Sequence, residues 1–165
     1  MTVSDEVLVG VAGIAITLIG FSGVVTALGR RDAGRWSPQE IFQLRTLVEP
    51  SIASLFSAFV ALSLNIVIAN EEVIWKIANG VCFVAHSVGI TLFVRRGSTG
   101  GLGLNVSYKV GFFISMIVML AMLIGMFSPS KWSQLTFLLG LSLGIYASLH
   151  NFYLLVFPMG EDSRK

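Results

Sequence analysis

The stretch VIWKIANGVCFVAHSVGITLFV (Val73–Val94) decides the fold, because it is a long apolar run closed by two acidic residues on one side and two basic residues on the other. As a helix with about 1.5 Å of rise per residue it covers roughly 33 Å, which is enough to cross the hydrocarbon core of a bilayer. Glu71 and Glu72 precede it, and Arg95 and Arg96 follow it. The run therefore predicts a membrane-spanning helix with a defined direction.

The composition of the whole chain also predicts that it lies in a lipid bilayer. Of its 165 residues, 55% are hydrophobic and only 12% are charged, and the mean hydropathy is +0.83. A single small core cannot bury this much apolar surface, so the excess must face lipid. The net charge of +2 is too small to indicate a nucleic-acid partner. The expected class is an all-α integral membrane protein whose partner is the lipid bilayer.

Four other apolar segments flank the first, which gives five expected spans. They cover residues 7–28, 51–69, 73–94, 110–127 and 132–157. Very short turns join the second span to the third and the fourth to the fifth, and such turns force antiparallel neighbours. We therefore expect a five-transmembrane-helix bundle that forms one domain over residues 1–160, followed by a polar tail at 161–165.

Lysine and arginine residues set the expected orientation of these spans. With five spans, nine of the eleven basic residues fall on one side of the membrane: Arg30, Arg31, Arg35, Arg45, Arg95, Arg96, Lys109, Arg164 and Lys165. Only Lys76 and Lys131 fall on the other side. Since basic residues collect on the cytoplasmic side, we expect the N-terminus outside and the C-terminus inside. The expected location is a bacterial-type cytoplasmic (inner) membrane.

A short amphipathic helix at residues 38–49 is expected before the second span. The pattern Ser37-Pro38-Gln39-Glu40 is typical of a helix start, and the apolar residues that follow recur on one face. Such a helix lies at the membrane interface. Pro50 has no amide N–H and its ring clashes with the carbonyl of Thr46, so we expect the helix to kink or break there.

The two histidines of the chain, His86 and His150, both lie inside apolar spans. They stand eight and seven residues from the cytoplasmic ends of the third and fifth spans, which run in the same direction, so we expect them at nearly the same depth. Three further polar side chains are candidates for an intramembrane site: Asn79, Asn65 and Glu49. In the structural alternative, the histidines hydrogen-bond neighbouring helices, and Glu49 pairs with Arg45 or another arginine.

Five short-looped spans without a soluble domain, together with these polar side chains, favour a channel or transport component. One five-helix protomer offers little room for a water-filled path, so we expect a homo-oligomer. The sequence contains no serine, histidine and acid set at catalytic spacing, no zinc-peptidase motif and no pair of buried carboxylates. We therefore do not expect an enzyme.

A second hypothesis is a redox or metal-binding membrane subunit, because His86 and His150 can bind a metal or hold a haem between them. Met122 and Met126 add thioethers, which suit Cu(I). This Met-x-x-x-Met spacing, followed by Gly140-x-x-x-Gly144 on the next span, resembles the motif pair of eukaryotic copper transporters. The resemblance covers only these residues, since those proteins have three spans and methionine-rich outer segments that are absent here.

The third hypothesis is a non-catalytic structural subunit of a larger membrane complex. Its support is a set of small-residue faces that allow helices to approach closely. Gly13 and Gly20 lie on such a face of the first span, and Gly140 and Gly144 lie on one of the fifth span. We expect all four glycines to pack against other helices.

Overall fold

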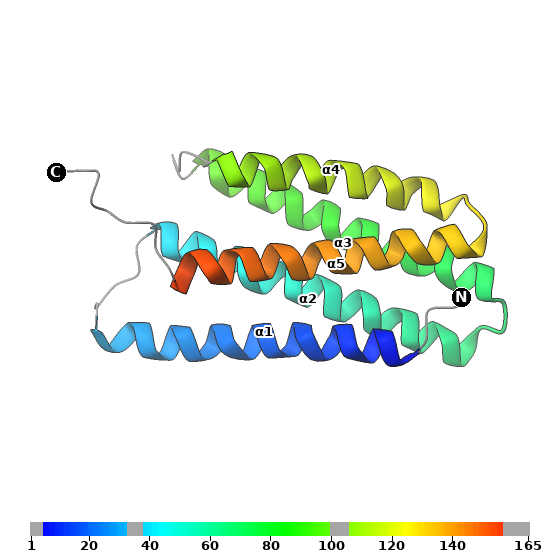
Figure 1. Cartoon of the computed structure of the whole chain (residues 1–165), viewed down its shortest axis with the longest axis horizontal. Coiled ribbons are helices and arrows are strands. Elements are labelled where there is room, and N and C mark those ends of the chain that lie inside the picture. The colour runs from blue at the N-terminus through cyan, green and yellow to red at the C-terminus, as the bar shows by residue number, and fades with distance from the viewer. Residues whose placement is uncertain (1–4, 33–37, 100–105, 157–165) are drawn as a thin grey trace.

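The computed structural model describes residues 5–32, 38–99 and 106–156 (Figure 1). Its five helices are α1 (Asp5–Asp32), α2 (Pro38–Val67), α3 (Glu71–Thr99), α4 (Val106–Met126) and α5 (Ser130–Val156). The described residues contain no β-strand. By length and composition all five helices can cross a membrane. An all-helical protein with five candidate spans is therefore confirmed, and the polar tail at 161–165 lies outside the described residues.

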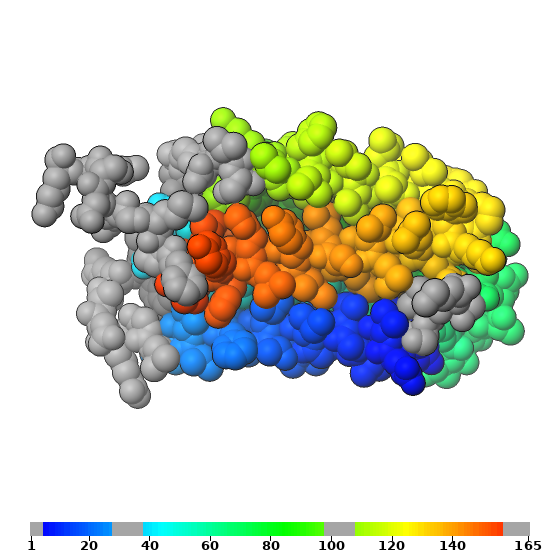
Figure 2. Space-filling view, viewed as in Figure 1, coloured from blue at the N-terminus to red at the C-terminus, as the bar shows by residue number. Residues whose placement is uncertain are grey.

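Helix α5 is the centre of the bundle. Its backbone packs against each of the other four helices, whereas in the described part of the chain the backbone of α1 packs only against α2 and α5, and that of α4 only against α3 and α5. Figure 1 shows α1 and α4 at opposite edges of the bundle, and Figure 2 shows α5 lying between them on one face. The short turns at 68–70 and 127–129 make α2–α3 and α4–α5 antiparallel hairpins, as the sequence predicted.

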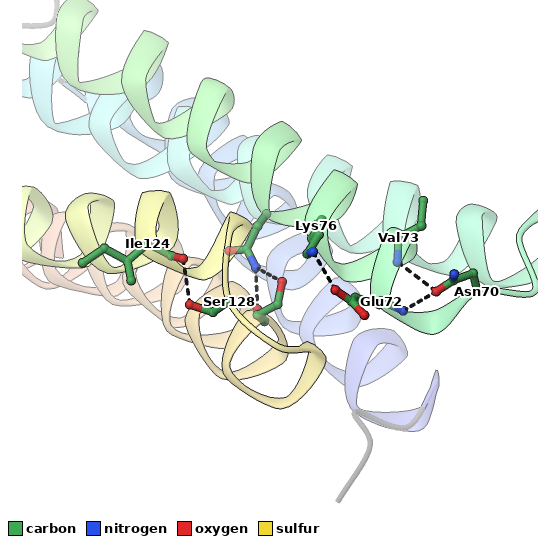
Figure 3. Close-up of polar contacts among 8 residues, drawn as sticks. Asn70, Glu72, Val73, Lys76, Ile124 and Ser128 are labelled. Carbon is green, nitrogen blue, oxygen red and sulfur yellow. Dashed lines mark hydrogen bonds and ion pairs between the residues drawn. The ribbon is translucent and has the colours of Figure 1, made fainter.

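Hydrogen bonds at both short turns fix where the helices begin and end (Figure 3). The Asn70 side chain accepts hydrogen bonds from the amides of Glu72 and Val73, at 3.0 and 3.4 Å. It is therefore the N-cap of α3, since it satisfies amides that have no partner within the helix. At the other turn the Ser128 hydroxyl donates to the Ile124 carbonyl at the end of α4.

The apolar core lies in one half of the bundle, next to these two turns. Its buried residues come from all five helices and are Leu8, Ala58, Ala61, Trp75, Ala78, Cys82, Met122, Phe137 and Leu141. Trp75 and Phe137 pack against each other with ring centroids 5.8 Å apart, and rings of this size contribute strongly to burial. We call these nine residues and their surroundings the packed half of the bundle.

The outer surface of the bundle is apolar. Phe59 on α2 and Phe113 on α4 expose 65% and 66% of their surface, and in the most apolar window of α4 only 11% is buried within the chain. Water would penalise such a surface, whereas a hydrocarbon environment does not. The exposed faces are those expected of helices in contact with lipid.

Residues 38–49 do not form a helix separate from the second span. Helix α2 begins at Pro38, as predicted, and continues through Pro50 to Val67, so the break that we expected at Pro50 does not occur. The reason lies on α5: the Asn151 side-chain amide lies 3.5 Å from the Thr46 carbonyl, which residue 50 cannot reach with an N–H. Neighbouring helices commonly satisfy carbonyls freed by proline in this way. Ser37 lies outside the described residues.

The glycines of α5 and α1 have different surroundings. A Cβ added to Gly144 would overlap Ser54 Oγ and lie 3.1 Å from the Pro50 carbonyl oxygen. One added to Gly140 would lie 2.8 Å from Met122 Sδ. A Cβ on Gly13 or Gly20 would meet no heavy atom within 4 Å. The α5 glycines thus allow close helix packing, while packing of the α1 glycines would require another molecule and stays a prediction.

Candidate functional site

A pocket of about 320 Å³ occupies the half of the bundle opposite the packed half. It lies between α2 and α4, whose described backbones are not close neighbours and which meet through the rings of Phe42 and Tyr108, and α3 and α5 close its sides. Most of its lining is apolar. His86, His150 and Glu49 all line it, so the structure brings these three predicted residues to one site. We call it the imidazole pocket.

His86 is held by its own helix. The residue is buried, with a relative exposure of 8%. Its Nδ1 lies 2.9 Å from the Cys82 carbonyl oxygen, one turn earlier on α3. A carbonyl can only accept, so Nδ1 carries the proton, and Nε2 of the neutral ring is left with a free lone pair. Nε2 lies beside Gly144 and close to the Gly140 carbonyl, and no hydrogen bond of good geometry is formed with it.

His150 stands among aromatic rings. Its ring stacks on that of Tyr146, one turn earlier on α5, with centroids 6.1 Å apart and an interplanar angle of 16°. The Tyr108 ring meets it edge-on, also at 6.1 Å. Its Nε2 is buried and, like that of His86, has no hydrogen-bond partner. The described residues contain one further buried orphan atom, Ser57 Oγ, and that residue does not line the pocket.

Several other polar groups of the pocket form hydrogen bonds within the protein. Asn151 Oδ1 accepts a hydrogen bond from the Tyr108 hydroxyl (3.2 Å) and lies 2.8 Å from Thr46 Oγ1. The Asn151 amide donates to the Ala147 carbonyl at 2.8 Å, and the Ser115 hydroxyl donates to its own helix. These groups therefore hold the pocket walls together, and among the described lining residues the buried side-chain polar atoms without a partner are the two imidazole Nε2 atoms.

Glu49 is part of an ion pair. Arg96 Nη1 lies 2.6 and 2.7 Å from its two carboxylate oxygens. Both side chains are about one-third exposed, at 33% for Glu49 and 29% for Arg96. The sequence analysis gave an ion pair with Arg45 or another arginine as the alternative to a functional role for Glu49, and the partner in the structure is Arg96 of α3. The pair joins α2 to α3 at the edge of the pocket.

The two predicted asparagines lie elsewhere. Asn79 is fully buried in the packed half, where it donates to the Ser133 hydroxyl at 2.9 Å and accepts from Thr136 Oγ1 at 3.3 Å. It therefore links α3 to α5. Asn65 is at the end of α2 and donates to the Asp5 carboxylate at 2.9 Å. Neither residue lines the imidazole pocket.

The predicted sulfur ligands also lie outside the pocket. Met122 Sδ and Cys82 Sγ share the space beside Gly140, since a Cβ there would lie 2.8 Å from one sulfur and 3.1 Å from the other. The Met126 methyl lies against Gly80 of α3. Among the described residues, no three His, Cys, Asp or Glu side chains form a cluster that could hold a metal ion.

The sequence prediction missed two residues that shape the pocket. Tyr108 begins the described side chains of α4, and its ring lies 5.9 Å from those of both Phe42 and Phe93. Pro50 has no N–H to donate to the Thr46 carbonyl. The sequence could have indicated the role of Thr46, because a carbonyl without its helical donor inside a membrane requires a donor from another helix. No comparable signal marked Tyr108.

The fold and the site together define the class: a bundle of five helices suited to a membrane, with an apolar pocket that contains two free imidazole nitrogens. No protein-family model, no curated protein and no solved structure matches this chain.

Proposed function

We propose that this protein is a membrane transport component, not an enzyme, and that its cargo binds in the imidazole pocket. One observation carries the proposal: His86 Nε2 and His150 Nε2 are buried, have no hydrogen-bond partner and belong to the lining of one pocket. A polar atom without a partner is costly in an apolar interior, and such atoms at membrane depth are commonly functional. An apolar pocket with a few polar atoms is also the usual form of a small-molecule site.

We propose the orientation that the basic residues predict, with the N-terminus outside and the pocket in the cytoplasmic half of a bacterial-type inner membrane. Single cysteines in a Cys82→Ser background test it. Ala69→Cys, in the turn between α2 and α3, should react with an impermeant maleimide added to intact cells. Lys109→Cys, exposed at the start of α4, should react only after lysis. The reverse pattern would overturn the orientation.

We also propose that the transport component is a homo-oligomer. The support is the face of α1 that carries Gly13 and Gly20. A Cβ added to either glycine would meet no atom of the same chain within 4 Å, and small residues allow helices of two molecules to approach closely. The mass of the protein in nanodiscs of defined size tests this. A single protomer per disc at every protein-to-lipid ratio would contradict it.

Flux through proteoliposomes tests the transport function itself. The panel contains protons, Na⁺, K⁺, chloride, glycerol, neutral amino acids, and apolar alcohols and phenols. We expect at least one solute to cross faster with the wild-type protein than with His86→Phe, which keeps a ring but removes the free nitrogen. Phe113→Leu, on the outer face of α4, is the matched control and should behave as wild type. If no solute crosses faster than in protein-free liposomes, the transport proposal fails.

A second candidate function is a haem-binding redox subunit, and one observation favours it. Metal-binding histidines commonly donate one ring N–H to a carbonyl and direct the other nitrogen at the metal, and His86 has this arrangement. Because the described residues offer no three-ligand cluster, a group that needs only two axial ligands fits better than a bare ion. The test is the absorption spectrum of the purified protein after incubation with haemin, and the absence of a Soret shift would remove this candidate.

A further inference from the structure

We infer that the cargo of the imidazole pocket is a neutral molecule with a mostly apolar body and at least one hydroxyl group that donates a hydrogen bond, the class to which alkylphenols belong. This inference rests on the proposed function and specifies its substrate. It follows from the protonation of His86, from the charge balance of the pocket and from the nature of its walls.

The hydrogen-bonding state of His86 defines what the ligand must offer. Its Nδ1 proton is already used by the Cys82 carbonyl, so Nε2 of the neutral ring can only accept. His150 Nε2 is the other free atom, and its ring can present either a donor or an acceptor. A ligand that fills the pocket without burying an unsatisfied atom must therefore bring a donor to His86.

Charge balance argues against an ionic ligand. Among the described residues that line the pocket, Glu49 is the only one with a carboxylate, and it is paired with Arg96. The lining residues otherwise include no lysine, arginine or aspartate. A cation bound there would find no free carboxylate among these residues, and an anion would find a positive charge only if an imidazole took up a proton. Burying an uncompensated charge at membrane level is expensive. A neutral ligand avoids this cost.

The pocket walls favour a ring as the body of the ligand. Phe93, Tyr108, Phe112 and Tyr146 all contribute to the lining, and Tyr108 and Tyr146 already contact the His150 ring edge-on and by stacking. Aromatic rings prefer these two arrangements with each other. The volume of about 320 Å³ is at the lower end of the range for small-molecule sites, which is roughly 300–1,000 Å³.

Three probes with the same alkyl chain test the inference by equilibrium binding to the full-length protein in nanodiscs. They are 4-hexylphenol, its methyl ether 4-hexylanisole, which has no donor, and 4-hexylbenzoate, which is an anion. We expect the wild-type protein to bind the phenol roughly tenfold more tightly than the ether, the difference that one satisfied buried hydrogen bond makes. The benzoate should bind more weakly than the phenol.

Protein variants separate this preference from partitioning into the lipid. His86→Phe should reduce the phenol-to-ether preference to about twofold or less, because the acceptor is gone, whereas Phe113→Leu should keep the wild-type preference. If His86→Phe does not fold, the comparison of the three probes on the wild-type protein still decides. Equal binding of phenol and ether, or tighter binding of the benzoate, would overturn the inference.

The outcome is independent of the flux assay. A tenfold preference for the phenol without any solute flux would support the ligand class and refute transport. Flux of a solute in a protein that does not distinguish phenol from ether would leave transport standing and refute the ligand class.

Discussion

Substitution of Gly144 by alanine should destabilise the bundle, because α5 packs tightly against α2 at this glycine and leaves no space for a Cβ. The new Cβ would overlap Ser54 Oγ and lie 3.1 Å from the Pro50 carbonyl oxygen, which is backbone and cannot rotate away. Overpacking of this kind costs about 1–3 kcal/mol. If Ser54 turns aside, its 3.2 Å hydrogen bond to the Leu141 carbonyl is lost, at a cost of about 1 kcal/mol.

The greater helix propensity of alanine opposes these losses by about 0.8–1 kcal/mol. The expected net loss in the free energy of unfolding is therefore about 2 kcal/mol. Reversible unfolding in mixed micelles, with SDS as the denaturant and circular dichroism as the signal, measures it. Gly13→Ala, measured at a detergent excess that keeps the protein monomeric, is the matched control, since its Cβ would meet nothing within 4 Å in its own chain, and it should be neutral or stabilising. Equal stabilities of the two variants would refute this account of the α2–α5 contact.

Three further predictions use the same unfolding assay. Asn151→Ala should lower the free energy of unfolding by about 1–3 kcal/mol, because it leaves the Thr46 carbonyl and the Tyr108 hydroxyl without this partner; a loss below about 0.3 kcal/mol would argue against that role. Asn79→Leu should cost about 0.6–1.7 kcal/mol, the usual range for interhelical hydrogen bonds in membranes, and an unchanged midpoint would contradict it. His86→Phe and His150→Phe should show a coupling energy of at least about 0.5 kcal/mol in a double-mutant cycle, because the residues share one pocket; strict additivity would indicate that they act separately.

The number and approximate position of the helices were predictable because they depend on hydropathy along the chain, a local property. The five expected spans fall on the five helices. Most ends differ by a few residues, but α2 begins at Pro38 and not at residue 51. The short turns predicted the two hairpins for the same reason: a few residues cannot connect helices that are not neighbours.

The pocket was predictable only in part. Counting residues from the ends of the spans placed His86 and His150 at one depth, and both line one pocket. Depth says nothing of the rotation of a helix about its axis, and this rotation decides which side chains meet. Rotation does not explain the place of Asn79, which lies on the same face of α3 as His86, two turns earlier; its position along the helix puts it in the packed half, where it meets Ser133.

The continuity of α2 through Pro50 shows a second limit of local reasoning. Proline in a helix predicts a break when only neighbours along the chain are considered. The donor that serves the freed carbonyl comes from Asn151, 105 residues after Thr46. Nothing within one turn of Pro50 could have shown that this donor would be present.

Because the imidazole pocket lies in one half of the bundle and the other half is densely packed, the pocket does not continue through the molecule. Between the pocket and the opposite end of the bundle lies the packed half, in which Trp75 and Phe137 expose only 1% and 0% of their surface. Complete passage of a solute would then require either a second conformation of this chain, in which those two rings separate, or a path along the interface between two copies of the protein. Trapping α3 and α5 together near Trp75 with an engineered crosslink would distinguish these routes, since it blocks the first and leaves the second open.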